Sequence, residues 1–454
     1  MPEESGAEYC RDREVRVGDG KLVVDRPLER AVVAEPRSWL YRVAGLRMRW
    51  PGFGAVVLIF LLSRLAFYIA TLLGSGLLPQ PGQWPGGVQL QSPLPLALHW
   101  RWDSIYYYGI AVGGYNFYYS HPVAGSDPSV LSAFFPLLPL LIRATATLLG
   151  GLRPPAAVPI EAASWPTLLA GPLVVQAASL LAFWLLFQLA REETNDAATA
   201  QRAVLYTAVF PFAFFYAVPY TEALFLAASV GTFLEARRGN WVRAGVWGAA
   251  ASATRLTGAL LLPVLALEIV LAARSGKLHG RDWPRALLGL QLAPLGMLFF
   301  VLYLWQRTGA PLAFLQAQQH WQRGEMVLPT TTLWRGIVFA VHPQWFTRSD
   351  LYTRDVLETL TVLGFLAVMV ASLRRWRPSY VLFGLLLFIV NLSSPLPGQL
   401  AMQSQGRYAM ALFPVFVTLA RWGWRPVVHQ AIVLLSLPLF ALLAALHVNW
   451  WFVA

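Results

Sequence analysis

Apolar runs close to 20 residues long recur along this chain of 454 residues. An α-helix needs about 20 predominantly apolar residues to cross roughly 30 Å of hydrocarbon. Within a bilayer, only helices and closed barrels satisfy all their own backbone hydrogen bonds. Repeated runs of this length therefore predict an all-α polytopic membrane protein.

The composition supports this class and excludes others. Hydrophobic residues make up 57% of the chain and charged residues 13%, whereas a soluble domain carries about 25% charged residues. The net charge is +12, but the basic residues are scattered at the ends of the apolar runs and form no stripe for a nucleic-acid backbone. Cys10 is the only cysteine, which excludes an intrachain disulfide and a cysteine-rich metal site. We expect no cofactor and no metal site, and leave open a supporting divalent cation.

The N-terminal segment differs from the rest. Residues 1–52 are polar and mixed in charge, and we expect them to form a cytoplasmic tail. The first apolar run starts near Phe53, too far along for a cleavable signal peptide. Arg42, Arg47 and Arg49 precede it and predict an inside N-terminus. Residues 53–454 then form the transmembrane domain.

Eleven apolar stretches are candidate membrane spans. With the N-terminus inside, eleven crossings place every short basic connection in the cytoplasm, while the opposite turn 218–220 has no basic residue. The predicted spans are 53–78, 166–190, 203–218, 221–236, 244–254, 258–273, 286–305, 355–373, 379–395, 408–421 and 427–448.

Residues 131–150 also resemble a span, but counting them as a crossing would invert every later loop. They contain Arg143 as well. We therefore predict a membrane-embedded, non-crossing helix within a first extracytoplasmic loop, 79–165. A second large extracytoplasmic loop covers 306–354.

The stretch 99–111 places a carboxylate, Asp103, beside two tryptophans and before the cluster Tyr106, Tyr107 and Tyr108. A carboxylate among aromatic residues at the membrane interface carries a free-energy cost, so its presence indicates a functional site. The alternative is an amphipathic helix that lies on the membrane with Trp and Tyr at headgroup depth.

Three other charged residues lie at the outer ends of predicted spans. Glu222 follows the tight outer turn, Arg255 separates two half-length helices, and Arg407 leads into a span. Simpler interpretations stay open: Glu222 as a helix cap, Arg255 as the ion-pair partner of Glu222 or Glu268, and Arg407 as an interfacial anchor. Convergence of two carboxylates and two guanidinium groups on one face favours a functional site.

The same outer face carries candidate substrate-binding side chains. The alternatives are interface packing for the tyrosines and an exposed loop position for the histidine. These candidates are Trp102, Tyr107, Tyr220, His320 and Trp321.

A lipid-phosphate sugar suits such a set, because its phosphate lies at headgroup depth. Transfer of the sugar needs a base for the acceptor hydroxyl, the role expected for Asp103 with Glu222 as the second candidate. Arginine forms bidentate phosphate contacts, so Arg255, Arg407 and Arg143 are the candidate phosphate ligands. No P-loop, dinucleotide fingerprint or nucleophile elbow is present.

The chain resembles the bacterial branch of the PIG-V mannosyltransferase family, which are membrane glycosyltransferases of the GT-C fold. Likeness is weaker through 311–321 and at 407–408, and Leu256-Thr257 departs from the Ser-Asn pair of eukaryotic members. The segments that carry the resemblance are Trp102-Asp103 with Tyr107, Ile110-Ala111 and Gly114-Tyr115; Phe134-Phe135-Pro136-Leu137 with Pro139 and Arg143; Tyr220–Phe225; Ala236–Gly239 with Trp241; and Thr254-Arg255 with Gly258.

The resemblance implies a GT-C fold, a polyprenyl-phosphate-mannose donor, inverting chemistry outside the cytoplasm and an essential first-loop aspartate, here Asp103. The expected partners are this donor, the lipid bilayer and an acceptor that is a glycan, a lipid or a protein, with the protein in the plasma membrane. Two other functions stay open. A transporter or flippase of lipid-linked sugars would need the arginines but no base, and a silent scaffold would need neither.

Overall fold

The structure is a computed structural model that describes residues 52–79, 94–116, 128–151, 160, 163–323, 326–342, 349–396 and 401–453. The expected N-terminal tail lies outside the described residues apart from Gly52, as do parts of both expected outer loops. All described residues belong to one compact unit, Leu46–Ala454.

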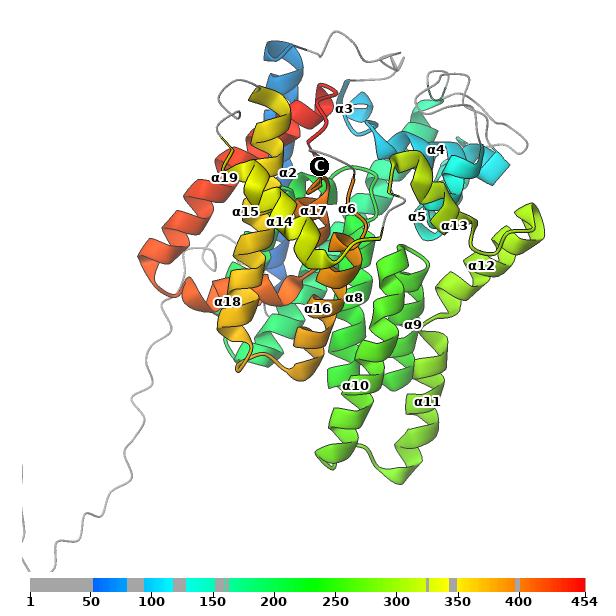
Figure 1. Ribbon diagram of the computed structural model, residues 1–454, viewed down its shortest axis with the longest axis vertical. Helices are drawn as coiled ribbons and strands as arrows, with labels where there is room; N and C mark the ends of the chain where they lie inside the picture. The colour runs from blue at the N-terminus through cyan, green and yellow to red at the C-terminus, as the bar shows by residue number, and fades with distance from the viewer. Residues whose placement is uncertain are drawn as a thin grey trace, which may run out of the picture. The chain divides into compact units, whose positions relative to one another are not determined.

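Every element in the described ranges is a helix, which confirms the all-α prediction. Figure 1 shows them along the chain. They are α2 (Phe53–Leu77), α3 (Leu94–Ala97), α4 (Asp103–Gly113), η1 (Gly114–Asn116), η2 (Pro128–Ala133), α5 (Leu137–Leu148), α6 (Trp165–Thr194), α7 (Ala197–Val209), η4 (Ala213–Tyr216), α8 (Glu222–Arg237), α9 (Trp241–Ser252), η5 (Leu256–Leu260), α10 (Leu261–Arg274), η6 (Gly280–Asp282), α11 (Trp283–Leu292), α12 (Leu295–Thr308), α13 (Ala313–Gln316), η7 (Ala317–Trp321), α14 (Pro329–Ala340), α15 (Ser349–Ser372), α16 (Pro378–Leu392), α17 (Gln405–Ala409), α18 (Phe413–Trp422) and α19 (Pro426–Val448).

Several helices can cross a bilayer, so the chain is an integral, multi-pass membrane protein. Six helical segments in the described part are long and apolar enough: 53–77, 165–194, 256–274, 280–308, 355–372 and 426–448. Helices α2 and α19 also expose large apolar side chains, such as Leu73 (57%) and Leu434 (71%). Surfaces of this kind are stable when lipid covers them.

Each of the eleven predicted spans coincides with helix, although the number of crossings stays a prediction. Some spans are broken where proline removes a backbone N–H donor. Pro294 lies between α11 and α12, and Pro211 lies between α7 and η4. The stretch 131–150 forms η2 and α5, and the 12 residues of α5 reach only about 18 Å. Helix α9, which forms a predicted crossing, also has 12 residues, so the non-crossing position of 131–150 stays a prediction.

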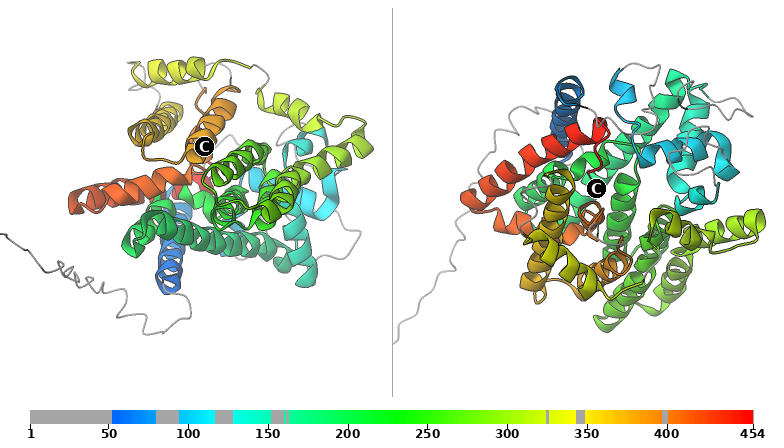
Figure 2. Two further views of the ribbon diagram at one scale, coloured as in Figure 1. Left: turned by 90° about the horizontal axis from the view of Figure 1, so that it is seen from below. Right: turned by 45° about the horizontal axis from the view of Figure 1, so that its top comes forward.

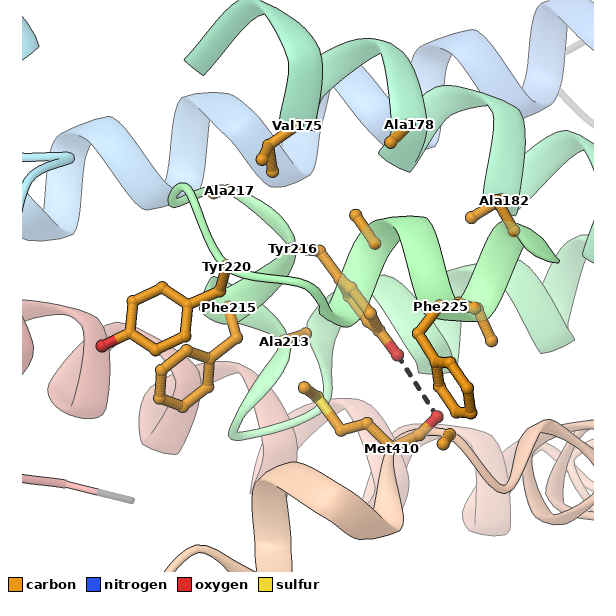
Figure 3. Close-up of a cluster of buried hydrophobic side chains, with 14 of the residues drawn as sticks. Val175, Ala178, Ala182, Ala213, Phe215, Tyr216, Ala217, Tyr220, Phe225 and Met410 are labelled. Carbon is orange, nitrogen blue, oxygen red and sulfur yellow. Dashed lines mark hydrogen bonds between the residues drawn. The ribbon is translucent and has the colours of Figure 1, made fainter. Parts of the chain in front are cut away.

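The core between α6 and α8 fixes the turn that leads to Tyr220 and Glu222. Figure 3 shows Val175, Ala178 and Ala182 of α6 facing the chain around η4. The contact between α6 and this turn is also polar, since Gln176 Nε2 donates to the Ala217 carbonyl at 3.0 Å. Tyr216 donates from its hydroxyl to the Met410 carbonyl at 3.3 Å, which ties the turn to the 405–413 region.

Helices far apart in the sequence complete the surroundings of the site. Helix α19 packs along α2. Helices α14, α15, α16 and α17 pack together, and Figure 2 draws these four in yellow to orange. The chain after α19 returns to the start of α4, where the Trp102 and Phe452 ring centroids lie 5.0 Å apart. The last residues of the described chain therefore pack against the residue that precedes α4.

Candidate active site

Four charged side chains from four separate parts of the sequence form one chain of ion pairs. Arg255 Nη1 lies 3.0 Å from Glu222 Oε1, and Arg407 Nε lies 3.3 Å from the same oxygen. Arg407 Nη1 donates to Asp103 Oδ2 at 3.0 Å. All four residues are candidates from the sequence, and the structure brings them together.

Asp103 is the first residue of α4, and the chain before it is held in an unusual conformation. Trp102 has φ 55° and ψ −126°, in a region that bulky residues rarely adopt. The Asp103 N–H donates to the Tyr220 hydroxyl at 3.1 Å. Arg101 donates to the carbonyls of Val448, Ala97 and Trp100 at 2.6–2.9 Å. Backbone strain tends to persist where the surroundings enforce it, often at functional sites.

Glu222 opens α8, where a carboxylate is favoured by the positive end of the helix dipole. Its side chain is 3% exposed, and Oε1 receives both guanidinium groups. In the described part of the chain, Oε2 has no hydrogen-bond partner. A buried carboxylate that holds two arginines fixes the distance between them.

Arg255 lies in extended backbone between α9 and η5. The turn that carries it depends on Gly258, since a Cβ there would lie 2.1 Å from the Ala251 carbonyl oxygen. The Arg255 guanidinium carbon lies 5.0 Å from the centre of the Tyr408 ring. Of the two ion-pair partners that the sequence left open for Arg255, the structure shows Glu222. Glu268 pairs instead with Arg237, at 3.4 Å.

Three arginines surround the Tyr408 ring. Their guanidinium carbons lie 5.0 Å (Arg255), 5.2 Å (Arg407) and 5.7 Å (Arg323) from its centre, within the range of cation–π attraction. Asp103 and Glu222 offset two of these three positive charges. The cluster is thus suited to an anion.

Access to the four charges is uneven. The Asp103 side chain is 29% exposed, whereas that of Arg407 is 10% exposed. Burial raises the pKa of Tyr107 and Tyr220, so both side chains stay neutral and add no negative charge to the network. Asp103 is therefore the accessible carboxylate of the network, placed to accept a proton.

The remaining predicted residues lie near α4 in different roles. Arg143 Nη1 donates to the carbonyls of Ala111 and Val112 at 2.9 and 3.2 Å, so its guanidinium binds the C-terminal end of α4. Trp321 packs edge-on against Tyr106, with ring centroids 5.5 Å apart. Other predicted residues are Tyr107, which contacts Phe134, and His320, which is exposed on η7.

Three charged residues that bind the backbone near the site were not predicted from the sequence: Arg101, Arg323 and Glu358. Glu358 had a detectable signal, since an acid at the start of an apolar span is rare. Arg323 follows Trp321 by two residues. Among the described residues, no three His, Cys, Asp or Glu side chains come together as metal ligands.

Comparisons with known proteins agree with the sequence motifs. The sequence model of the family described as Mannosyltransferase (PIG-V) matches residues 75–282. No curated protein sequence matches the chain.

Several solved structures are similar to this one at low sequence identity. ArnT from Cupriavidus metallidurans, bound to undecaprenyl phosphate, has 13% identity and a TM-score of 0.47, over 88% of this chain and 77% of that one. The oligosaccharyltransferase of Archaeoglobus fulgidus, in complex with zinc and sulfate, has 15% identity and a TM-score of 0.42, over 87% of this chain. The archaeal oligosaccharyltransferase AglB from the same organism, with an inhibitory peptide and a dolichol-phosphate, has 14% identity and a TM-score of 0.40, over 84% of this chain.

This chain spans 53% and 56% of the two oligosaccharyltransferase chains. The family match is more specific, because it covers α4, α5 and α8 and includes Asp103, Glu222 and Arg255. The predicted resemblance to the PIG-V mannosyltransferase family is confirmed over residues 75–282.

Proposed function

We propose that the protein is an inverting glycosyltransferase of the GT-C type, which moves a sugar from a polyprenyl-phosphate donor to an acceptor hydroxyl outside the cytoplasm. The observation that carries the proposal is the ion-pair chain from Arg255 through Glu222 and Arg407 to Asp103, with its one accessible carboxylate. The family match supports mannose as the sugar.

In this reaction Asp103 acts as the general base. Its carboxylate takes the acceptor hydroxyl proton while the acceptor oxygen bonds to the anomeric carbon. The bond from that carbon to the phosphate oxygen breaks, and its electron pair stays on the phosphate. Attack opposite the leaving phosphate inverts the anomeric configuration. The guanidinium of Arg407 orients the Asp103 carboxylate, because it donates to Oδ2 at 3.0 Å.

The arginines stabilise the leaving phosphate. Arg255 and Arg407 are held by one oxygen of Glu222, at 3.0 and 3.3 Å, and therefore lie side by side. Guanidinium groups that are fixed in advance stabilise charge as it develops, without reorganisation. Glu222 then orients the arginines, and the three guanidinium groups around Tyr408 complement the donor phosphate.

The direct test supplies purified protein in lipid nanodiscs with radiolabelled polyprenyl-phosphate-mannose, and measures transfer to added glycan, lipid or peptide acceptors and hydrolysis to free mannose. Either product supports the proposal. Donor that crosses the bilayer of a proteoliposome intact, with neither product formed, would favour the flippase. Donor that is neither cleaved nor moved would favour the scaffold and overturn the proposal.

The outward orientation of the site is tested by cysteine labelling in a Cys10→Ser background. Ser164 lies in the predicted outer loop and Ser275 follows α10 in a predicted cytoplasmic loop, and both side chains are exposed. We expect a membrane-impermeant thiol reagent to label Ser164→Cys from outside and Ser275→Cys only after permeabilisation. Labelling of both variants from the same side would contradict the topology.

A further inference from the structure

The segment that carries Arg407 is held in a conformation that its own sequence does not favour. Ser404 has φ 70° and ψ 4°, in the left-handed region that favours glycine. Gly406 packs so closely on Phe212 that a Cβ would lie 2.3 Å from the ring. Something outside the segment must therefore fix residues 404–407.

Glu358 of α15 provides that restraint. Its Oε1 accepts the Ser404 N–H at 3.0 Å, and its Oε2 accepts the Gly406 N–H at 3.1 Å. These N–H groups lie at the start of α17, where a helix has no internal acceptors for them. Glu358 is fully buried. Hydrogen bonds from N–H groups to a buried carboxylate are among the stronger ones in proteins.

Arg323 restrains the same segment through a carbonyl group. Its Nη2 donates to the Gln403 carbonyl at 3.0 Å, and its Nη1 donates to the Ser394 carbonyl at 3.2 Å. Charged groups of both signs, from α15 and from the chain after η7, therefore bind backbone groups of Gln403, Ser404 and Gly406, just before Arg407. The guanidinium of Arg407 contacts both Asp103 and Glu222.

We propose that Glu358 is a positioning residue: it fixes the backbone of residues 404–407 and thereby places the Arg407 guanidinium between Asp103 and Glu222. The consequence for turnover rests on the proposed function of the site. The restraint itself does not, so the two can be tested separately.

The first test measures the restraint without turnover. Ser404→Cys, in the Cys10→Ser background, introduces a thiol of similar shape at a position that is 4% exposed. Glu358→Gln keeps the volume but leaves one acceptor oxygen for two N–H groups. We expect a small thiol reagent to modify the introduced thiol about tenfold faster with Glu358→Gln, the change expected for loss of one hydrogen bond to a charged group.

Glu235→Gln is the matched control, because Glu235 is also a buried acceptor but lies at the far end of α8. It should leave the modification rate of the introduced thiol unchanged. Equal modification rates with and without Glu358→Gln would overturn the proposal.

The second test asks whether Glu358 acts through Arg407. We expect Glu358→Gln to lower kcat about tenfold in the wild-type background and to have no further effect in Arg407→Ala. A residue that acts only through the backbone that places the Arg407 guanidinium has nothing to place once that guanidinium is removed. The same loss in both backgrounds would mean that Glu358 acts elsewhere, and would also overturn the proposal. A wild-type protein that transfers no sugar would refute the proposed function, while the thiol modification rates would still decide the restraint.

Discussion

Two clusters of arginines and carboxylates in this protein use the same residue types in different ways. The Asp103 cluster comprises Asp103, Glu222, Arg255 and Arg407. The Glu268 cluster comprises Glu193, Arg237, Glu268 and Arg377. Glu193 and Arg237 lie near the C-terminal ends of α6 and α8, Glu268 lies in the middle of α10, and Arg377 precedes α16.

The Glu268 cluster joins helices. Arg237 contacts Glu193 at 3.0 Å and Glu268 at 3.4 Å, and each carboxylate also accepts a hydroxyl from α16. Tyr380 donates to Glu193 at 2.9 Å, and Ser379 donates to Glu268. In the Asp103 cluster, Glu222 keeps an oxygen without a hydrogen-bond partner among the described residues, and Asp103 is partly exposed. Spare acceptor capacity on Glu222 and solvent access to Asp103, rather than residue type, therefore distinguish the Asp103 cluster, for which we propose catalysis, from the Glu268 cluster.

The largest effect should come from removing the base. Asp103→Asn keeps the shape of the side chain and loses its basicity, so we expect kcat to fall by about 10²–10⁴-fold with little change in donor Kd or thermal stability. Asp196→Asn, at the N-cap of α7, is the matched control and should transfer at the wild-type rate. Near-normal transfer by Asp103→Asn would move the base elsewhere, with Glu222 the next candidate.

A smaller effect is expected at the phosphate. Arg255→Ala should weaken donor binding and lower kcat together, each by about tenfold, because a charged contact is lost. Arg255→Lys should rescue only part, since lysine lacks the planar fork. Donor affinity is measured on the folded fraction. If the folded Arg255→Ala protein bound donor normally, Arg255 would be only the structural partner of Glu222.

The Glu268 cluster should show the opposite behaviour. Glu268→Gln removes a buried charge that pairs with Arg237 and Arg377, so we expect the protein to lose about 1.5–3 kcal/mol of stability and to show a lower thermal midpoint. Transfer per folded molecule should stay at the wild-type level. A specific loss of transfer, with the thermal midpoint unchanged, would erase the distinction between the two clusters.

The smallest effect concerns the orientation of α4. Tyr220→Phe removes the hydroxyl that accepts the Asp103 N–H at 3.1 Å. Since a neutral hydrogen bond contributes about 1 kcal/mol, kcat should fall about fivefold. Steady-state kinetics alongside thermal unfolding checks this. A loss as large as that of Asp103→Asn would give Tyr220 a direct part in the chemistry.

The sequence was sufficient to predict the helices and most members of the site. Apolar runs define membrane helices directly, because the bilayer imposes their length and hydrogen bonding. Asp103, Glu222, Arg255 and Arg407 were predictable as charged residues at the outer ends of such runs. Their pairing was not, since Asp103 and Arg407 are 304 residues apart and meet only through tertiary packing.

The rest depended on contacts between side chains and backbone whose partners cannot be identified from the sequence. Arg143 was expected at the phosphate but binds carbonyl groups of α4, because α5 packs against that helix. Glu358 was interpreted as part of an apolar span, although its carboxylate binds two N–H groups near Ser404. Contacts from side chain to backbone depend on where two elements meet, which residue type alone does not specify.

The most direct test of the central claim is a single-turnover measurement on donor-loaded protein, with Asp103→Asn and Glu268→Gln compared at equal amounts of folded, donor-bound protein. We expect Asp103→Asn to hold its donor and form almost no product, while Glu268→Gln forms product at the wild-type rate. Product formation by donor-loaded Asp103→Asn at the wild-type rate would contradict the central claim.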